Sequence, residues 1–247
     1  MDRKEKPREG ARPTDRPSVA VDVALLTTED EALFTVVVPR EAPPHRGRFA
    51  LPGTFVHADE SLEDAAHRAL RDKVGAFRVY LEQLYTFGTP KRDPRERVIT
   101  VAYYALVARD RLVLSKGAEP ARIARVEVPW EGETGGPVVC KDATGKDARR
   151  EAELELAFDH ADILGMAVKR LRGKLGYSPI GFQLLPERFT LLDLQRVHET
   201  ISGMPLNKDS FRRKMLASGQ LEATGELQQD VGHRPAELYR FARRSAI

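Results

Sequence analysis

Charged side chains between Leu51 and Gly75 make this segment the part of the chain best suited to phosphate chemistry. Glu60 stands just before a run whose apolar residues recur at helical spacing, and Arg68 follows eight residues later. Hydrolysis of a nucleoside diphosphate requires divalent metals, which neutralise phosphate charge and lower the pKa of the attacking water. Such metals need several carboxylate oxygens on one helix face. The acidic content of this helix therefore decides whether the chemistry is available.

The segment resembles the Nudix box, a loop-helix-loop with the pattern G-x5-E-x7-R-E-U-x-E-E-x-G-U. When the pattern is anchored on Gly75, Glu60 and Arg68 fall on its Glu and Arg. Its first glycine falls on Thr54, with Gly53 one residue early. Because these positions agree in a single register, we favour a Nudix-related fold over a simple amphipathic helix with solvated charges.

The three acidic helix positions of the box fall on Ala69, Asp72 and Lys73. Alanine supplies no metal ligand, and aspartate has a shorter reach than glutamate. A lysine at the metal position repels a divalent cation by an energy on the order of several kcal/mol. We therefore predict no catalytic residue, no metal site and no cofactor, and we expect Glu60 and Arg68 to form a structural ion pair.

A Nudix-like fold without metal ligands can still keep a pocket for a small molecule. Arginines stand in the loop 88–97 and just before the box, and their guanidinium groups offer paired donors that match phosphate. The predicted ligand-binding residues are Arg48, Glu60, Arg92, Arg95 and Arg97. For each arginine the alternative is a solvated surface position.

A second group of residues suited to binding lies in a helix predicted from Lys208 to Ser218. At 100° per residue its buried stripe comprises Phe211, Met215 and Leu216. The opposite face is small, polar and cationic, and comprises Ser210, Arg213, Lys214 and Ala217. Such a face suits the major groove of DNA, where arginine and lysine donate to guanine. We assign Arg212 to phosphate contact or internal pairing, and the helix cap to Asn207 or Asp209.

Two short strands predicted in the stretch from Leu221 to Phe241 form a wing with Arg234 near its tip, where an arginine reaches phosphates or a minor groove. The predicted DNA-binding residues are Asn207, Lys208, Ser210, Arg212, Arg213, Lys214 and Arg234. From Lys169 onward the chain carries 14 Lys+Arg against 8 Asp+Glu, a formal +6, whereas the preceding residues sum to −3. This skew favours a polyanionic partner over the alternative that the small unit only dimerises.

Hydrophobic periodicity predicts the elements that position both groups. Strands are expected at 18–26, 32–38, 49–56 with a break at 52–53, 80–87, 98–107 and 126–130, with a late hairpin of 138–140 and 154–158. Helices are expected at 61–74, from an Asp159 cap to about 174, from a Thr190 capping box to about 201, and at 208–218. The stretch 179–186 is predicted to be an extended connector outside both cores. One of Tyr103 and Tyr104 is expected to point inward as core, and the other is a candidate to stack on a base.

At 247 residues the chain is long enough for two domains. We predict a disordered basic tail at 1–16, a Nudix-like effector-sensing domain at 17–158, and a linker helix with a winged-helix DNA-binding domain at 159–247. No apolar run approaches the roughly 20 residues that span a bilayer, and the N-terminal stretch lacks the apolar core of a secretory signal. One cysteine, Cys140, forms no internal disulfide. We therefore expect a cytoplasmic protein without a membrane partner.

Three short strings behind the box, at 156–160, 211–214 and 234–241, together resemble the Nudix-related transcriptional regulators of NAD metabolism. This resemblance implies an α+β fold, with a mixed-sheet α/β/α sandwich followed by a winged helix-turn-helix domain. It also implies a homodimer that binds operator DNA and represses genes of NAD synthesis or salvage. ADP-ribose or a related nucleotide is the implied effector. Two alternatives stay open, a regulator of sugar catabolism that senses a sugar and an active Nudix hydrolase of ADP-ribose-like substrates.

Overall fold

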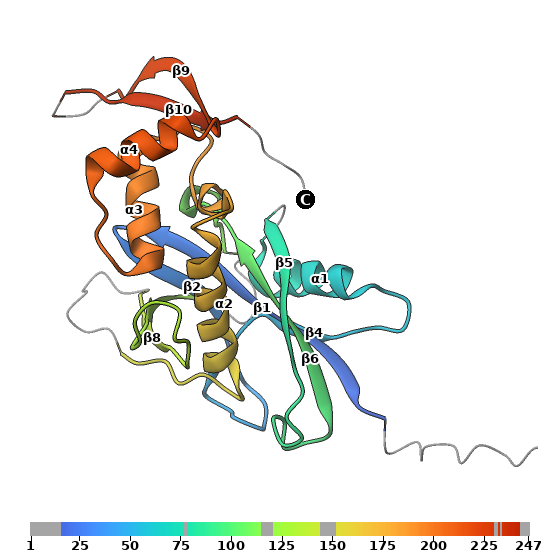
Figure 1. Cartoon of the computed structure of the whole chain (residues 1–247). Helices are drawn as coiled ribbons and strands as arrows, with labels where there is room; N and C mark the ends of the chain where they lie inside the picture. The colour runs from blue at the N-terminus through green and yellow to red at the C-terminus, as the bar shows by residue number, and fades with distance from the viewer. Residues whose placement is uncertain are drawn as a thin grey trace, which may run out of the picture.

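The computed structural model describes residues 16–76, 79–114, 121–143, 152–229, 232 and 234–242 (Figure 1). The strands are β1 (Ser18–Glu29), β2 (Ala32–Pro39), β3 (Phe49–Ala50), β4 (Gly53–Phe55), β5 (Tyr80–Phe87), β6 (Val98–Leu106), β7 (Arg122–Glu127), β8 (Val139–Asp142), β9 (Leu221–Leu227) and β10 (Glu237–Phe241). The helices are α1 (Leu62–Val74), α2 (His160–Lys174), α3 (Leu191–Ser202) and α4 (Lys208–Ala217), with short 3-10 turns at Arg109–Arg111 and Ile180–Leu184. The predicted tail lies outside the described residues, apart from Arg16.

Among the described residues, eight strands form one mixed sheet. Its main path runs β5-β6-β1-β2-β7-β8, with β3 paired to β2 and β4 paired to β1. β1 and β6 are parallel, whereas β1 and β2 are antiparallel neighbours joined by a tight turn. The long apolar stretches of β1 and β6 suit this central position because they are covered on both faces.

Two helices cover the two faces of this sheet (Figure 1). α1 packs on one face with Val21, Val23 and Leu25, and α2 belongs to the core on the other face. Tyr103 and Tyr104 alternate between the faces, and both are buried, at 6% and 0% exposed. The expectation that one of them can stack on a base was wrong, because helices cover both faces of the sheet here and both side chains are core. The α/β/α sandwich is confirmed.

Local signals fix α1 where the sequence predicted it. The Ser61 hydroxyl accepts a hydrogen bond from the backbone N–H of Asp64, and Gly75 ends the helix with a φ of 73°. This left-handed backbone conformation favours glycine, because a residue with a Cβ atom adopts it at a higher free-energy cost. The helix therefore holds positions 60 to 75 in the geometry of a Nudix box.

α2 begins after Asp159, but the expected capping role of the Asp159 side chain was wrong. Its carboxylate makes no hydrogen bond to the helix and accepts two from Arg92 instead. Farther along, α2 lies so close to the chain at Gly136 that a Cβ on Gly165 would stand 1.8 Å from the Gly136 carbonyl oxygen. At its far end, Arg172 donates to the carbonyl of Ile201 on α3 at 2.8 Å.

The predicted connector 179–186 is instead part of the core. Residues 180–184 form a 3-10 turn, and the side chains of Ile180, Phe182 and Leu184 are buried. The Phe182 ring stacks on Phe241 at 4.4 Å, so this stretch packs beneath the wing. The prediction failed because it rested on the flanking prolines and ignored the apolar residues between them.

The C-terminal part is a winged helix, as predicted. Thr190 and Asp193 form the reciprocal capping box that begins α3, and Gly203 ends the helix. β9 and β10 pair antiparallel, and Phe189 makes two backbone hydrogen bonds with Tyr239 that extend this small sheet. Phe211 and Met215 of α4 are buried, but Leu216 is 46% exposed, so its place in the buried stripe was wrong.

Two other predicted strands are shifted or divided. β7 spans Arg122–Glu127 and not 126–130, because the chain leaves the sheet before Pro129, which lacks a donor for the ladder. The late hairpin forms between β8 and residues 152–154. The residues that follow bond to β3 instead, since the N–H of Phe49 donates to the carbonyl of Glu155 and the N–H of Ala157 donates to the carbonyl of Phe49. Residues 144–151, between the two strands of this expected hairpin, lie outside the described residues. Among the described residues, no helix combines the length and apolar character that crossing a bilayer requires.

Candidate ligand cavity and DNA interface

A cavity of about 540 Å³ opens where the ends of β1 and β4 meet the start of α2. Residues from the box, from the loop after β2 and from the loop after β5 contribute its polar lining. The charged and aromatic lining residues are Asp22, Arg40, Glu41, Phe55, Lys73, Arg92, Asp93, Arg95, Phe158 and His160. Gly53 makes room at the wall, since a Cβ there would stand 2.3 Å from Oδ1 of Asp22.

Arg92 is the most buried cation of the cavity, with its side chain only 5% exposed. Its guanidinium donates to both carboxylate oxygens of Asp159, at 2.6 and 2.9 Å, and to Asp22 at 3.4 Å. Two carboxylates near one guanidinium offset the cost of burying that charge. The positive charge of Arg92 is therefore largely compensated within the protein.

Arg95 and Arg40 lie near the same aromatic ring. Arg95 forms a bidentate pair with the buried carboxylate of Asp93, at 2.6 and 3.0 Å. The guanidinium of Arg40 stands 4.7 Å from the Phe158 ring centre, and that of Arg95 stands 5.8 Å away. Burial and the neighbouring Arg95 lower the pKa of Arg40. Phe158 itself has a φ of 54°, a strained conformation of the kind that gathers at functional sites.

His160, the first residue of α2, closes the inner end of the cavity. It is 4% exposed, and its Nδ1 accepts a hydrogen bond from the backbone N–H of Leu51 at 2.9 Å. Burial lowers the pKa of His160, so the ring is neutral at pH 7. A neutral ring that accepts at Nδ1 carries its proton on Nε2, which lies 3.6 Å from Oδ1 of Asp22.

The predicted ion pair between Glu60 and Arg68 is present. Arg68 donates to both oxygens of Glu60, at 2.6 and 3.0 Å, and also to the Thr54 hydroxyl and the Phe55 carbonyl. The Arg68 guanidinium, with the N–H of His57, lowers the pKa of Glu60 to about 2. These contacts hold the box loop against α1.

The box positions do not offer a donor set for a divalent metal. Both oxygens of Glu60 are engaged by Arg68, and Ala69 is buried without a ligand atom. Asp72 has a half-exposed side chain and pairs with Arg71 on the surface of the helix. Among the described residues, no three His, Cys, Asp or Glu side chains are grouped so that they can hold a metal ion. The residues present therefore do not fit the metal of a Nudix hydrolase.

The structure brings together only part of the predicted ligand set. Arg92 and Arg95 line the cavity, whereas Arg48 pairs with Glu155 at 3.0 Å and does not line it. Arg97 is exposed outside the lining, and Glu60 is engaged by Arg68. Sequence reasoning missed Asp22, Arg40, Asp93, Phe158 and His160. Of these, Phe158 and His160 lay in the Phe-Asp-His string at 158–160, which was used only as a mark of resemblance.

The predicted DNA-binding residues gather on and around α4. The Asn207 side chain caps the helix by accepting from the N–H of Ser210 at 3.0 Å. The side chains of all five predicted residues on α4 are exposed, namely Lys208, Ser210, Arg212, Arg213 and Lys214. Lys208, Arg212 and Arg234 line one groove of about 640 Å³ between α4, the start of α3 and the wing. The exposed side of α4 thus forms a mainly cationic surface, with four cations and the carboxylate of Asp209.

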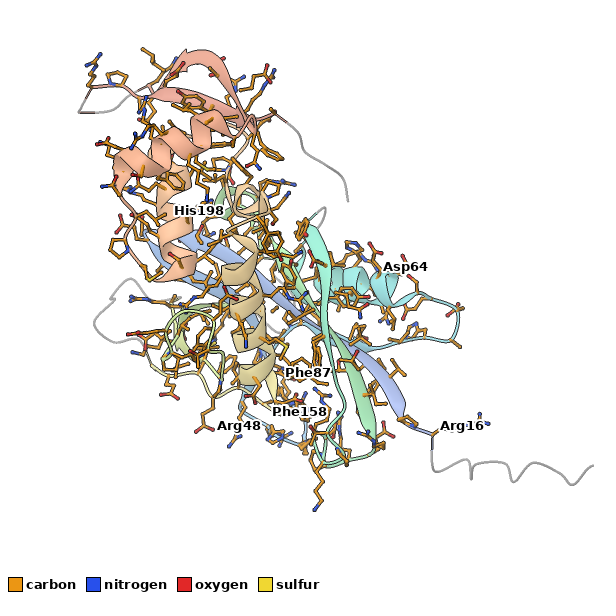
Figure 2. The ribbon with its side chains drawn as sticks, viewed as in Figure 1. Arg16, Arg48, Asp64, Phe87, Phe158 and His198 are labelled. Atoms are coloured by element: carbon orange, nitrogen blue, oxygen red, sulfur yellow. The ribbon has the colours of Figure 1, made fainter. Side chains whose placement is uncertain are left out.

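The ligand cavity and this cationic surface lie toward opposite ends of α2. Phe158 precedes the first turn of α2, whereas His198 lies on α3 of the winged helix (Figure 2). A Nudix-type sandwich with an arginine-lined cavity, followed by a winged helix, defines a Nudix-related DNA-binding regulator. Family models agree, since that of the NUDIX domain matches residues 16–132 and that of the NrtR DNA-binding winged helix domain matches 181–241.

Similar proteins extend this agreement over most of the chain. The ADPR responsive transcriptional repressor NtrR of Acinetobacter baylyi is 36% identical over 232 residues, which cover 92% of this chain and 82% of that protein. The crystal structure of Shewanella oneidensis NrtR complexed with a 27mer DNA is 32% identical, with a TM-score of 0.72 and coverage of 90% and 93%. An ADP-ribose pyrophosphatase of Methanocaldococcus jannaschii is 31% identical over 105 residues, 42% of this chain and 60% of that protein. The chain belongs to the NrtR family of transcriptional repressors.

Proposed function

We propose that this protein is a homodimeric repressor of NAD synthesis or salvage genes whose affinity for operator DNA changes when ADP-ribose binds. The name of the Acinetobacter relative supports the effector, and the DNA complex of the Shewanella relative supports the partner. A partner of duplex DNA also supports the cytoplasmic location expected from the sequence. We place the domain boundary at Asp159, so that 17–158 senses the ligand and 159–247 binds DNA.

One observation carries this proposal. Within a chain of the NrtR family, α2 starts in the wall of the cationic cavity and ends on α3 of the winged helix, where Arg172 bonds Ile201. A nucleotide diphosphate matches the arginines of the cavity through charge-assisted hydrogen bonds. Arg213 and Lys214, exposed on α4, are our assigned donors to base edges, with Lys208, Arg212 and Arg234 near the phosphates.

We also propose that the NUDIX domain binds its ligand without hydrolysing it. Ala69 and Lys73 in place of carboxylates support this, because two metal ligands of the box are absent. The ADP-ribose pyrophosphatase relative favours the alternative of a working hydrolase, yet it spans only 42% of this chain. The second alternative, a neutral sugar as effector, does not use the positive charge of Arg40, which lines the cavity without a direct ion pair.

DNA binding by the full-length protein tests the regulatory role. Fluorescence anisotropy with labelled promoter fragments of NAD synthesis and salvage genes from the same genome should show tight, sequence-selective binding. Half-sites related by two-fold symmetry are expected for a dimer. ADP-ribose should change the affinity by at least several-fold, whereas pentoses should not. Equal binding to every fragment, with no response to ADP-ribose, contradicts the proposal.

Incubation with ADP-ribose and Mg²⁺ or Mn²⁺ tests the absence of hydrolysis. We expect no AMP above the buffer rate, while a thermal-shift assay shows that ADP-ribose raises the melting midpoint, since it binds the folded state. Turnover that Glu60→Gln abolishes would establish the hydrolase alternative instead. A midpoint raised by pentoses but not by ADP-ribose would establish the sugar alternative.

A further inference from the structure

The cations of the ligand cavity fall into two groups by the carboxylates around them. Arg92 is paired with Asp159 and Asp22, and Arg95 is paired with Asp93. Lys73 and Arg40 also line the cavity, but among the described residues no carboxylate oxygen lies within 4.0 Å of either charge. These two side chains are therefore the cavity's cations without a direct ion pair, although Asp93 and Asp22 act on Arg40 from a longer distance.

Arg40 is fixed in place, whereas Lys73 projects from the last turn of α1. The Arg40 Nε donates to the carbonyl of Pro44 at 3.0 Å, and its guanidinium lies over the Phe158 ring. Lys73 stands two residues before the Gly75 cap, at a position where the Nudix box has a metal-binding glutamate. The ammonium group of Lys73 therefore lines the cavity from α1, the helix that carries metal-binding glutamates in a Nudix hydrolase.

We infer that the ammonium of Lys73 takes the place of the divalent metal and, with Arg40, binds the diphosphate of the ligand directly. This inference rests on the proposed function and adds that ligand binding needs no metal. Two cations without a direct ion pair, from different elements, match the two negative charges of a diphosphate diester. A lysine is suited to this role because it is a compact point charge that reaches phosphate oxygens without fixed geometry.

The arrangement also explains why the box keeps its shape after losing its ligands. The pair between Glu60 and Arg68 holds the loop, and the Gly75 cap ends α1, so the position of residue 73 beside the cavity is maintained. A lysine at this position changes the role of the helix from holding a metal to holding an anion.

Isothermal titration of the full-length protein with ADP-ribose tests the inference, first in EDTA and then in excess Mg²⁺. We expect the same affinity in both buffers. Lys73→Glu should weaken binding about 10-fold or more in EDTA, because a carboxylate then faces the phosphates. Lys73→Met should also weaken binding, but by less.

Arg71→Glu is the matched control. It makes the same charge change two residues away, and Arg71 pairs with Asp72 outside the cavity. The Arg71→Glu variant should bind ADP-ribose with the same affinity as the unmodified protein. Thermal melts check that every variant is folded. We expect all of them to fold, because the side chains of Lys73 and Arg71 are exposed. Unchanged affinity of both Lys73 variants in EDTA overturns the inference.

Inorganic pyrophosphate, used as a second probe, separates this inference from the proposed function. Binding of pyrophosphate in EDTA that depends on Lys73, without binding of ADP-ribose, would uphold the inference and refute the effector. Binding of both probes only in Mg²⁺ would refute the inference and leave the effector in place. If neither probe binds in either buffer, both proposals fail.

Discussion

Arg92 and Asp159 are joined by two hydrogen bonds, 2.6 and 2.9 Å long, that tie the loop after β5 to the N-cap of α2. The pair sets the orientation of a helix that reaches from the ligand cavity to the winged helix. Its cost is an uncapped helix, because the Asp159 carboxylate makes no bond to the first turn.

We predict that Asp159→Ala lowers the free energy of unfolding by about 2 kcal/mol, because the buried charge of Arg92 keeps only its longer contact with Asp22. Urea denaturation measures this loss. Asp162→Ala, on the exposed face of the same first turn, is the control and should cost less than about 1 kcal/mol. Equal losses for the two variants would show that the ion pair contributes nothing specific.

Two glycines of α2 give opposite predictions. A Cβ on Gly165 meets the backbone carbonyl of Gly136, which cannot yield without moving the 136–138 chain, so Gly165→Ala should destabilise the protein by about 2 kcal/mol or more. A Cβ on Gly173 meets only the end of the flexible Glu133 side chain. Gly173→Ala should therefore be neutral or stabilising by up to about 1 kcal/mol, through helix propensity. Thermal melts of both variants check the difference.

His198 makes stability depend on pH. Burial, and to a lesser extent the charge of Lys214, lowers its pKa to about 4, and the ring packs edge-on against Phe211. The unfolded chain binds this proton with a pKa near 6.5. The contribution of His198 is thus fully present above pH 6.5 and is lost as the pH falls toward 4, by up to about 1.4 kcal/mol per pH unit.

Denaturation of His198→Leu across this pH range is the measurement. The variant should show a shallower loss of stability between pH 6.5 and 4 than the unmodified protein. His67→Leu, which removes a histidine whose side chain is 42% exposed, should keep the original slope. Parallel curves for His198→Leu and the unmodified protein would refute this assignment.

Arg213→Ala should weaken binding to the cognate operator by about 1 to 3 kcal/mol and relax the preference at one base pair. The reason is the exposed position of Arg213 on α4, where its guanidinium can donate to a base edge in the major groove. Arg71→Ala removes one exposed cation on α1 and serves as the control. A gel shift with unchanged affinity and selectivity for Arg213→Ala would exclude it from base readout.

The sequence predicted best those features that depend on neighbours in the chain. Ser61 and Gly75 bound α1 as expected, the Thr190 capping box begins α3, and the box register identified the Glu60 to Arg68 pair. Each depends on residues a few positions apart. The two-domain architecture followed from combining such segments in order.

The failures depend on contacts between distant segments. Asp159 looked like a helix cap because Arg92, 67 residues away, could not be foreseen as its partner. The sequence predicted that Lys73 repels a metal ion. It could not show that Lys73 and Arg40 line the same cavity, because α1 and the loop after β2 meet only in the folded chain. The sequence likewise did not show that Arg92 and Arg95 are in direct ion pairs with carboxylates.

The burial of Phe182 and Phe189 has a consequence for how such proteins diversify. Phe182 and Phe189 belong to one apolar cluster with Leu164 and Leu171 of α2 and with Leu26 of the sheet. A recombination event that joined the sensor of one lineage to the DNA reader of another would leave both halves with mismatched apolar surfaces. We therefore expect substitutions within each part to be tolerated better than an exchange of whole parts, because the shared cluster is then kept intact.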